Sequence, residues 1–185
     1  ERLEQTPIWL FEWLRQQHDG PYWRQGSLAP HWDRFTTPTF LIGGWTDEYV
    51  DAAIRMLERC TNAPRRALIG NWVHSYPDDA YPGPNLDWYH EMVRFLDHWL
   101  KGIDNGIEKV PRVRVYDMGA KQWRTYDAWP PRDARPITYF LASGGRANTK
   151  DGDGRLDLAK PKANGRDTFT YDPMDPTPSA GGQVC

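Results

Sequence analysis

The chain has 185 residues, of which 39% are hydrophobic and 26% charged, and its formal net charge at pH 7 is −2. This composition is typical of a globular protein with one domain or two small ones, and it excludes a disordered chain and a coiled coil. Because no basic excess is available to neutralise phosphates, we expect no nucleic-acid partner.

A membrane span and a disulfide framework are also excluded. The longest apolar run, Ile8 to Phe11, is far too short to cross a bilayer. The first residues do not resemble a signal peptide, so we expect no membrane partner and a cytoplasmic location. Cys60 and Cys185 are the only cysteines, which excludes both a disulfide framework and a cysteine-based zinc site.

Residues 1–36 are predicted to begin with a helix. Thr6 can cap this helix, and Pro7 stands at a plausible first helical position, where its missing N–H costs nothing. The helix is apolar on most sides and is therefore expected to need cover on both faces. The run Asp19-Gly20-Pro21 is predicted to end it. The apolar residues of the helix are Ile8, Trp9, Leu10, Phe11, Trp13 and Leu14.

Residues 37–109 alternate between strand and helix patterns. Residues 39–42 and 67–69 are short apolar runs bounded by glycine or proline, as in strands that are buried on both faces. An amphipathic helix pattern follows each run, over residues 50–57 and 89–100. The order strand, helix, strand, helix predicts an α/β fold with a parallel sheet.

Residues 110–185 are expected to form a second domain of short strands. Glycine, proline, asparagine and aspartate separate the strand patterns, which is typical of an antiparallel β-sandwich. Gly102 is placed to end the preceding helix, and the composition of residues 102–111 is suited to a boundary between the domains. The predicted strands cover residues 113–116, 123–126, 137–141 and 169–171.

Two loops follow the predicted buried strands, and each carries a side chain suited to acid–base chemistry. Asp47 lies in the loop after the first strand, and His74 lies in the loop after the second. Ligands of open α/β sheets bind beyond the carboxyl ends of the strands. An imidazole can act as a general base near neutral pH, and a carboxylate on its other nitrogen fixes its tautomer. The order Asp then His also matches the last two members of an α/β-hydrolase triad.

Each of these residues also has a structural interpretation. Asp47 precedes a helix and could be only its N-cap, and His74 could be a turn histidine that hydrogen-bonds a loop carbonyl. A nucleophile elbow requires glycine two residues before and two residues after the serine, and no serine of the chain has both. The residues alone therefore predict two members of a triad without the nucleophile. The serines are Ser27, Ser75, Ser143 and Ser179.

Other candidate sites are weaker. Trp45 and Trp72 stand beside the two candidates and could line an acyl pocket, although core packing explains them at least as well. Asp151–Arg155 resembles the start of a calcium loop but lacks the later ligands, so a hairpin turn is expected. His90 and His98 are not at the spacing of a helical metal pair and are predicted on a solvated helix face. We expect no metal and no organic cofactor.

Several segments together resemble one known family. The two loop regions, residues 43–47 and 68–74, resemble the cocaine esterase/Xaa-Pro dipeptidyl-peptidase group of serine hydrolases, the CocE/NonD family. The resemblance covers nearly the whole chain. Further segments that resemble this family are Arg15–Asp19, Tyr22-Trp23, Tyr81–Pro84, Arg94–Gly102, Val113–Gly119, Trp123-Arg124, Trp129–Pro131, Leu141–Gly145 and Tyr171–Pro173.

This resemblance implies an α/β-hydrolase that acts on esters or amides through an acyl-enzyme. It assigns residues 1–36 to the end of a helical cap, residues 37–109 to the C-terminal part of the parallel hydrolase sheet with its helices, and residues 110–185 to part of a jelly-roll β-sandwich. Asp47 matches the family's triad acid and His74 its triad base. The family's serine elbow and oxyanion hole lie upstream of the cap, so the resemblance implies a segment of a longer enzyme.

Two other functions are left open by the sequence. An aromatic-rich β-sandwich can be a non-catalytic binding module, and a hydrolase without an elbow can be a degenerate partner in an assembly. On the leading hypothesis, the substrate is a small ester or amide. Unpaired strand edges and exposed apolar faces are then expected to drive self-association or pairing with the missing N-terminal part.

Overall fold

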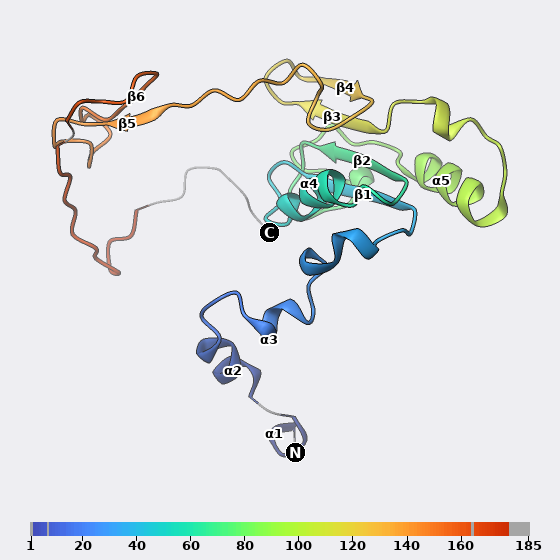
Figure 1. Ribbon diagram of the computed structural model, residues 1–185, viewed down its shortest axis with the longest axis horizontal. Helices are drawn as coiled ribbons and strands as arrows, with labels where there is room; N and C mark the ends of the chain where they lie inside the picture. Colours follow the sequence, from blue (N-terminus) through green and yellow to red (C-terminus); the bar gives the residue numbers. More distant parts are fainter. Residues whose placement is uncertain (1, 7, 164, 178–185) are drawn as a thin grey trace. The chain divides into compact units, whose positions relative to one another are not determined.

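A computed structural model describes residues 2–6, 8–163 and 165–177, and the chain divides into two compact units (Figure 1). The first unit ends at Pro131, and the second begins at Arg132. No helix among the described residues is long and apolar enough to cross a membrane.

Short helices form the N-terminal part of the first unit. The helix α2 begins at Trp9, because Ile8 has an extended backbone and occupies the N-cap position without a side-chain hydrogen bond. The prediction that Thr6 caps this helix is therefore wrong, and Pro7 lies outside the described residues. The large apolar side chains from Ile8 to Leu14 are exposed. The helices are α1 (Arg2–Gln5), α2 (Trp9–Arg15), α3 (Pro21–Arg24) and the 3-10 helix η1 (Ala29–Arg34).

A four-stranded mixed sheet forms the centre of the first unit, with the strand order β1-β2-β3-β4. Strand β1 (Thr39–Gly44) pairs in parallel with β2 (Arg65–Gly70), and their register aligns Thr39 with Arg65 and Gly44 with Gly70. The two strands therefore end at the same edge of the sheet. Strand β3 (Val113–Asp117) pairs in parallel with β2, and β4 (Gln122–Tyr126) pairs antiparallel with β3.

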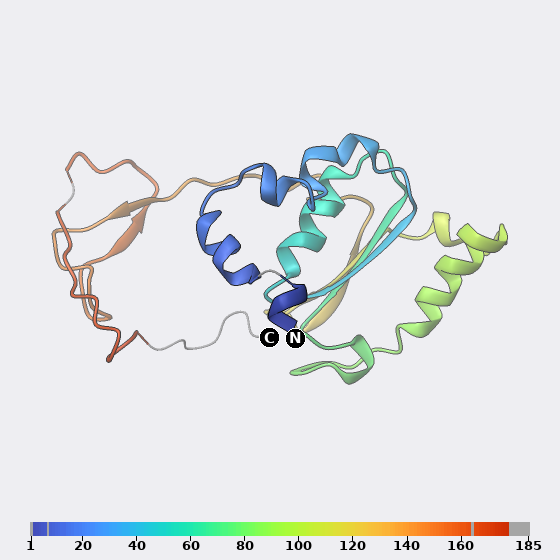
Figure 2. The ribbon, with the colours of Figure 1, turned by 90° about the horizontal axis from the view of Figure 1, so that it is seen from below.

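Helices and loops cover both faces of the sheet, and Figure 2 shows α4 and α5 on opposite sides of the strands. Helix α4 (Val50–Arg59) connects β1 to β2, and helix α5 (Tyr89–Lys101) precedes β3. The short 3-10 helices η2 (Pro77–Asp79) and η3 (Ile107–Lys109) flank α5 in the sequence. On the α4 side the buried core consists of Leu41, Val50, Leu57, Ala67, Ile69, Val113 and Val115; on the other it consists of Leu68, Trp72 and Trp88.

The predicted α/β class is confirmed. The sheet also contains β3 and β4, whose residues were expected to belong to the second domain. Gly102 ends α5 in the left-handed conformation, with φ at 69°, as predicted. The boundary proposed from residues 102–111 falls inside the first unit of the structure. The reason is that β3 pairs with β2 through Ala67 and Val113, which ties the chain after the boundary to the parallel strands.

The second unit contains a small antiparallel pair. Strand β5 (Phe140–Ala142) pairs with β6 (Arg155–Asp157), so the pattern over residues 137–141 is a strand only at its end. The strand predicted over residues 169–171 does not form. Phe169 and Tyr171 are exposed there and have no sheet to pack against in the described part of this unit. A complete sandwich is not formed by these residues.

Candidate active site

The loops after β1 and β2 are held together by backbone hydrogen bonds. The Trp45 N–H donates to the Gly70 carbonyl at 2.8 Å, and the Thr46 N–H donates to the Trp72 carbonyl at 3.3 Å. These bonds continue the pairing of the parallel strands past their last residues. As a result, the residues that follow in the two loops are close in space although 27 positions separate Asp47 from His74.

Asp47 and His74 form a carboxylate–imidazole pair, as their place at the strand ends predicts. The distance from His74 Nδ1 to Asp47 Oδ2 is 3.2 Å. The Asp47 side chain is only 12% exposed, whereas the His74 side chain is 55% exposed. A buried carboxylate thus holds one nitrogen of a ring that solvent can reach, an arrangement that suits an imidazole which exchanges protons.

Asp47 also holds the start of α4, although it is not the N-cap residue of that helix. The N-cap of α4 is Tyr49, and Asp47 Oδ1 accepts the Tyr49 N–H at 2.9 Å. One carboxylate oxygen therefore holds the turn before α4 while the other contacts His74. In the described structure, the hydrogen-bond partner of His74 Nδ1 is this carboxylate and not a loop carbonyl.

Two glycines allow the chain to pack tightly beside this pair. A Cβ at Gly44 would meet the Trp72 carbonyl and indole, and a Cβ at Gly70 would meet the same indole. Trp72 is 1% exposed and lies across both strand ends, where it also packs against Trp123. The glycines at these strand ends are thus required by the close approach of Trp72.

A cavity of about 330 Å³ opens beside the pair. Trp72 lines it, even though most of its ring belongs to the core. Trp45 is not among its lining residues; its indole N–H donates to the Tyr116 carbonyl at 2.8 Å, and its ring packs near Trp129. The lining residues are Ile42, Gly43, Asp47, Trp72, His74, Ser75, Tyr76, Pro77 and Trp88.

Sequence reasoning identified Ser75 only as a serine without the elbow glycines, and it missed two other neighbours of the pair. The Tyr49 ring contacts the His74 ring edge-on, with centroids 5.3 Å apart. Tyr76 stacks on Trp88 at the border of the cavity. Ser75 has a buried hydroxyl without a hydrogen-bond partner in the described structure. Their only sequence signal is their closeness to Asp47 and His74, which does not reveal side-chain direction.

None of the described serines is hydrogen-bonded to His74. Ser75 adjoins it in sequence, but its hydroxyl makes no hydrogen bond to the imidazole. Ser143 donates to Asp153 Oδ1 at 3.1 Å, and Ser27 accepts the Ala29 N–H at 3.1 Å. Ser179 lies outside the described residues. The described residues therefore supply an acid and a base but no serine in contact with them.

The remaining candidates have structural roles. The Asp153 carboxylate accepts hydrogen bonds from Ser143 and from the Gly144 and Arg146 N–H groups, which closes the turn between β5 and β6. His90 lies on the solvated face, as predicted. The same prediction is wrong for His98, whose side chain is 15% exposed because it packs against Trp99 and faces the Ile103 carbonyl.

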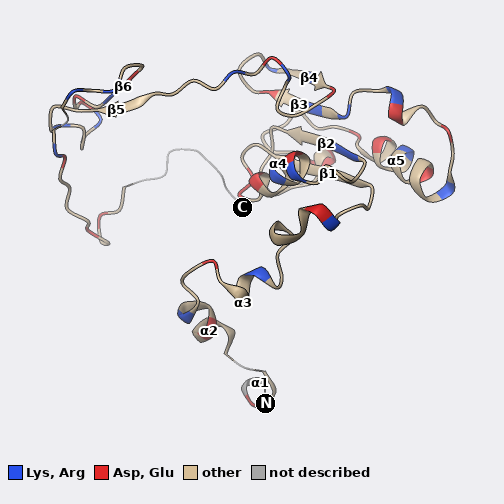
Figure 3. Cartoon of the chain, in the orientation of Figure 1, with Lys and Arg blue, Asp and Glu red and all other residues tan. Residues whose placement is uncertain are grey.

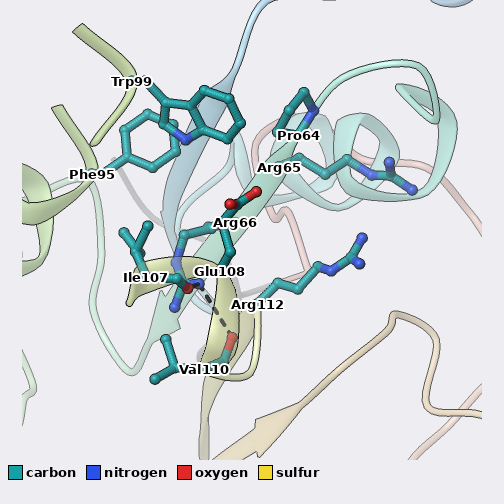
Figure 4. Close-up of a pocket in the computed structure, with 9 residues that line it drawn as sticks. All are labelled: Pro64, Arg65, Arg66, Phe95, Trp99, Ile107, Glu108, Val110 and Arg112. Carbon is teal, nitrogen blue, oxygen red and sulfur yellow. Dashed lines mark hydrogen bonds between the residues drawn. The ribbon is translucent and has the colours of Figure 1, made fainter. Parts of the chain in front are cut away.

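The opposite edge of the sheet carries a second cavity of about 270 Å³, shown in Figure 4. Figure 3 shows the basic residues at the start of β2, at this edge. Arg65 donates to the Leu57 and Cys60 carbonyls at the end of α4, and Arg66 donates to the Ile107 and Pro111 carbonyls. Burial lowers the pKa of both guanidinium groups. Both arginines are thus engaged in holding backbone carbonyls.

Comparison with known proteins gives matches along most of the chain. Residues 1–76 match the family model of the X-Pro dipeptidyl-peptidase (S15 family), and residues 105–185 match that of the X-Pro dipeptidyl-peptidase C-terminal non-catalytic domain. Cocaine esterase of Rhodococcus sp. (strain MB1 Bresler) is 31% identical over 174 residues, which are 88% of this chain and 30% of that protein.

Solved structures have the same fold. A CocE/NonD family hydrolase from Staphylococcus aureus aligns with a TM-score of 0.52 at 14% identity, over 72% of this chain and 24% of that one. An aminopeptidase from the marine sediment archaeon Thaumarchaeota archaeon aligns with a TM-score of 0.54 at 22% identity, over 88% of this chain and 28% of that one. The matched region is 24% to 30% of the length of these three proteins. The two family models and the match to cocaine esterase mean that the chain belongs to the CocE/NonD family of Xaa-Pro dipeptidyl-peptidase-like hydrolases.

Proposed function

We propose that this chain supplies the acid and the base of a Ser-Asp-His triad in a serine hydrolase of esters or amides. The observation that carries the proposal is the 3.2 Å contact between His74 Nδ1 and the buried Asp47 carboxylate at the ends of two adjacent parallel strands. The nucleophilic serine is proposed to lie in sequence that precedes this chain. Residues 110–185 are proposed to belong to a jelly-roll β-sandwich, and the open sheet is proposed to pair with the preceding part of the protein.

Each member of the pair has one task in this mechanism. With its proton on Nδ1, His74 donates to Asp47 Oδ2, and its Nε2 is left with the lone pair that accepts the serine proton. The serine oxygen then attacks the acyl carbon, and the leaving group takes the proton from Nε2. Asp47 stays ionised throughout and stabilises the imidazolium. Water repeats the same steps to release the acid.

The surroundings of the pair support this assignment. Asp47 is held by the Tyr49 N–H as well as by His74, so its carboxylate is fixed before the reaction starts. The adjoining cavity is lined mainly by aromatic and aliphatic side chains, such as Trp72, Trp88 and Ile42. A small ester or amide with an apolar acyl group fits such a lining.

A fluorophosphonate probe, read by intact mass, tests the proposal. The 185-residue chain is expected to form no adduct, whereas an N-terminally extended form that includes the serine is expected to form one, at a serine outside residues 1–185. In the extended form, His74→Ala is expected to abolish labelling. The matched control is His90→Ala, an exposed histidine on α5, which is expected to leave labelling unchanged.

Either of two results would overturn the proposal. One is an adduct on Ser75 in the 185-residue chain, which would place the nucleophile within it. The other is unchanged labelling of the extended form after His74→Ala, which would remove the imidazole from the mechanism.

A further inference from the structure

Tyr49 contacts both members of the pair. Its backbone N–H donates to Asp47 Oδ1 at 2.9 Å, and its ring meets the His74 ring with centroids 5.3 Å apart and an interplanar angle of 66°. The first contact fixes the carboxylate. The second touches the imidazole directly and depends on the side chain of residue 49.

Core packing does not account for the Tyr49 ring. The residue is 57% exposed and belongs to neither buried cluster of the sheet. A large aromatic side chain that remains in solvent gains little from burial at its position. The ring lies against the imidazole, with the two centroids 5.3 Å apart.

The imidazole needs such a contact because most of its surface is free. Its side chain is 55% exposed, and within the described part of the chain its one hydrogen bond is the 3.2 Å contact with Asp47. A ring with one polar contact can turn about χ1 and χ2 and lose that hydrogen bond. An edge-on aromatic neighbour favours one orientation of the ring, and aromatic pairs of this geometry are favourable beyond the area that they bury.

We propose that Tyr49 is a positioning residue whose ring holds His74 in the orientation in which Nδ1 meets Asp47. The Tyr49 backbone fixes the carboxylate, and its ring fixes the imidazole, so one residue at the start of α4 aligns both groups. The expected effect of Tyr49 on the rate of hydrolysis rests on the proposed function. Its effect on the orientation of the His74 ring does not, because that orientation can be measured without any reaction.

The first measurement is the tautomer of His74 in the 185-residue chain, by long-range ¹H–¹⁵N correlation of the neutral ring. The unsubstituted chain and Tyr49→Phe, which keeps the ring, are expected to show the Nδ1–H form. Tyr49→Leu is expected to raise the ratio of the Nε2–H to the Nδ1–H form about three- to tenfold, the factor that one ring contact supplies. The control Tyr89→Leu removes an exposed ring that stacks on Trp88, and it is expected to change nothing.

The second measurement is the hydrolysis of a p-nitrophenyl ester by the N-terminally extended form. Tyr49→Leu is expected to lower kcat about three- to tenfold with little change in KM, and Tyr49→Phe is expected to restore kcat. An unchanged tautomer ratio in Tyr49→Leu would overturn the inference. So would an equal loss in Tyr49→Phe, because the ring would then not be the cause. If the tautomer shifts while His74→Ala leaves the rate unchanged, the proposed function fails and the positioning role stands.

Discussion

The two edges of the parallel pair β1–β2 use polar side chains in opposite ways. At the amino end, Arg65 and Arg66 direct their guanidinium groups to backbone carbonyls of α4 and of the segment before β3. At the carboxyl end, the polar groups of Asp47 and His74 contact each other, and His74 stays accessible to solvent. At the amino end of these two strands the polar side chains connect elements of the fold. At the carboxyl end the imidazole of His74 remains accessible to solvent.

The difference has a simple physical source. A guanidinium group that donates several hydrogen bonds to carbonyls has little capacity left for a ligand, and it strengthens the connection between elements. An imidazole that uses one nitrogen keeps the other for proton transfer. The comparison predicts that substitutions at the amino edge change stability, whereas substitutions of the pair at the carboxyl edge change reaction rate.

The largest expected effect is on rate, at the carboxyl edge. Asp47→Asn is expected to lower kcat of the N-terminally extended form about 10⁴-fold, because the amide favours the wrong tautomer of His74. Its melting temperature is expected to stay close to that of the unsubstituted protein. Steady-state hydrolysis and thermal melting on the same sample check both points. Full activity in Asp47→Asn would remove the difference between the two edges.

Packing at the carboxyl edge provides the second prediction. Gly44→Ala is expected to lower the free energy of unfolding by about 2–3 kcal/mol, because its Cβ would meet the Trp72 carbonyl and indole. Gly43→Ala, in the same strand, is the control: its Cβ would meet Ile69, Ala53 and Val50 at ordinary contact distances of 3.4–3.9 Å. Urea unfolding of the two variants measures the difference, and equal losses would contradict the role assigned to Trp72.

The third prediction concerns the amino edge. Arg65→Met is expected to lower the free energy of unfolding by about 1.5 kcal/mol, because the Leu57 and Cys60 carbonyls lose a charged donor. Fluorophosphonate labelling of the extended form is expected to remain unchanged. Arg55→Met, on the exposed face of α4, is the control for loss of charge alone. A loss of labelling in Arg65→Met would mean that the two edges are coupled.

The smallest expected effect tests whether a charged side chain at the carboxyl edge, that of Asp117, contributes to the stability of the fold. At the end of β3, the Ala120 N–H and the Arg124 guanidinium hydrogen-bond the Asp117 carboxylate and lower its pKa. A lowered folded-state pKa gives stabilisation that is present above the ordinary carboxyl pKa and is lost as the pH falls. Asp117→Asn is expected to lower the melting temperature slightly at about pH 7 and not at about pH 2. A difference that persists at the acid pH would contradict this cause.

The position of the candidate pair was predictable from the sequence because it depends on local signals. The short apolar runs that became β1 and β2, with a helix pattern between them, indicate parallel strands whose carboxyl ends share one edge. Asp47 and His74 lie in the loops that follow these runs, so their approach in space is expected once the two strands pair. The catalytic role itself is still a prediction.

The rest of the site and the fold depends on contacts that a sequence pattern does not contain. The pairing of β3 with β2 joins residues more than 40 positions apart, and the composition between them suggests a boundary instead. The strand pattern at Phe169 to Tyr171 has no sheet to join in the described unit. The ring contact of Tyr49 depends on side-chain direction at a helix start, which the spacing of apolar residues does not fix.

The separation of Asp47 and His74 does not depend on the length of the helix between their loops. Backbone hydrogen bonds between the strands and just beyond them set the separation of Asp47 and His74, whereas the number of residues that α4 contributes does not. The outer face of α4, with Asp51 and Arg55 in solvent, is therefore a natural point at which to attach a dye or a solid support. A tether attached there would join the chain at a helix whose length does not set the separation of Asp47 and His74.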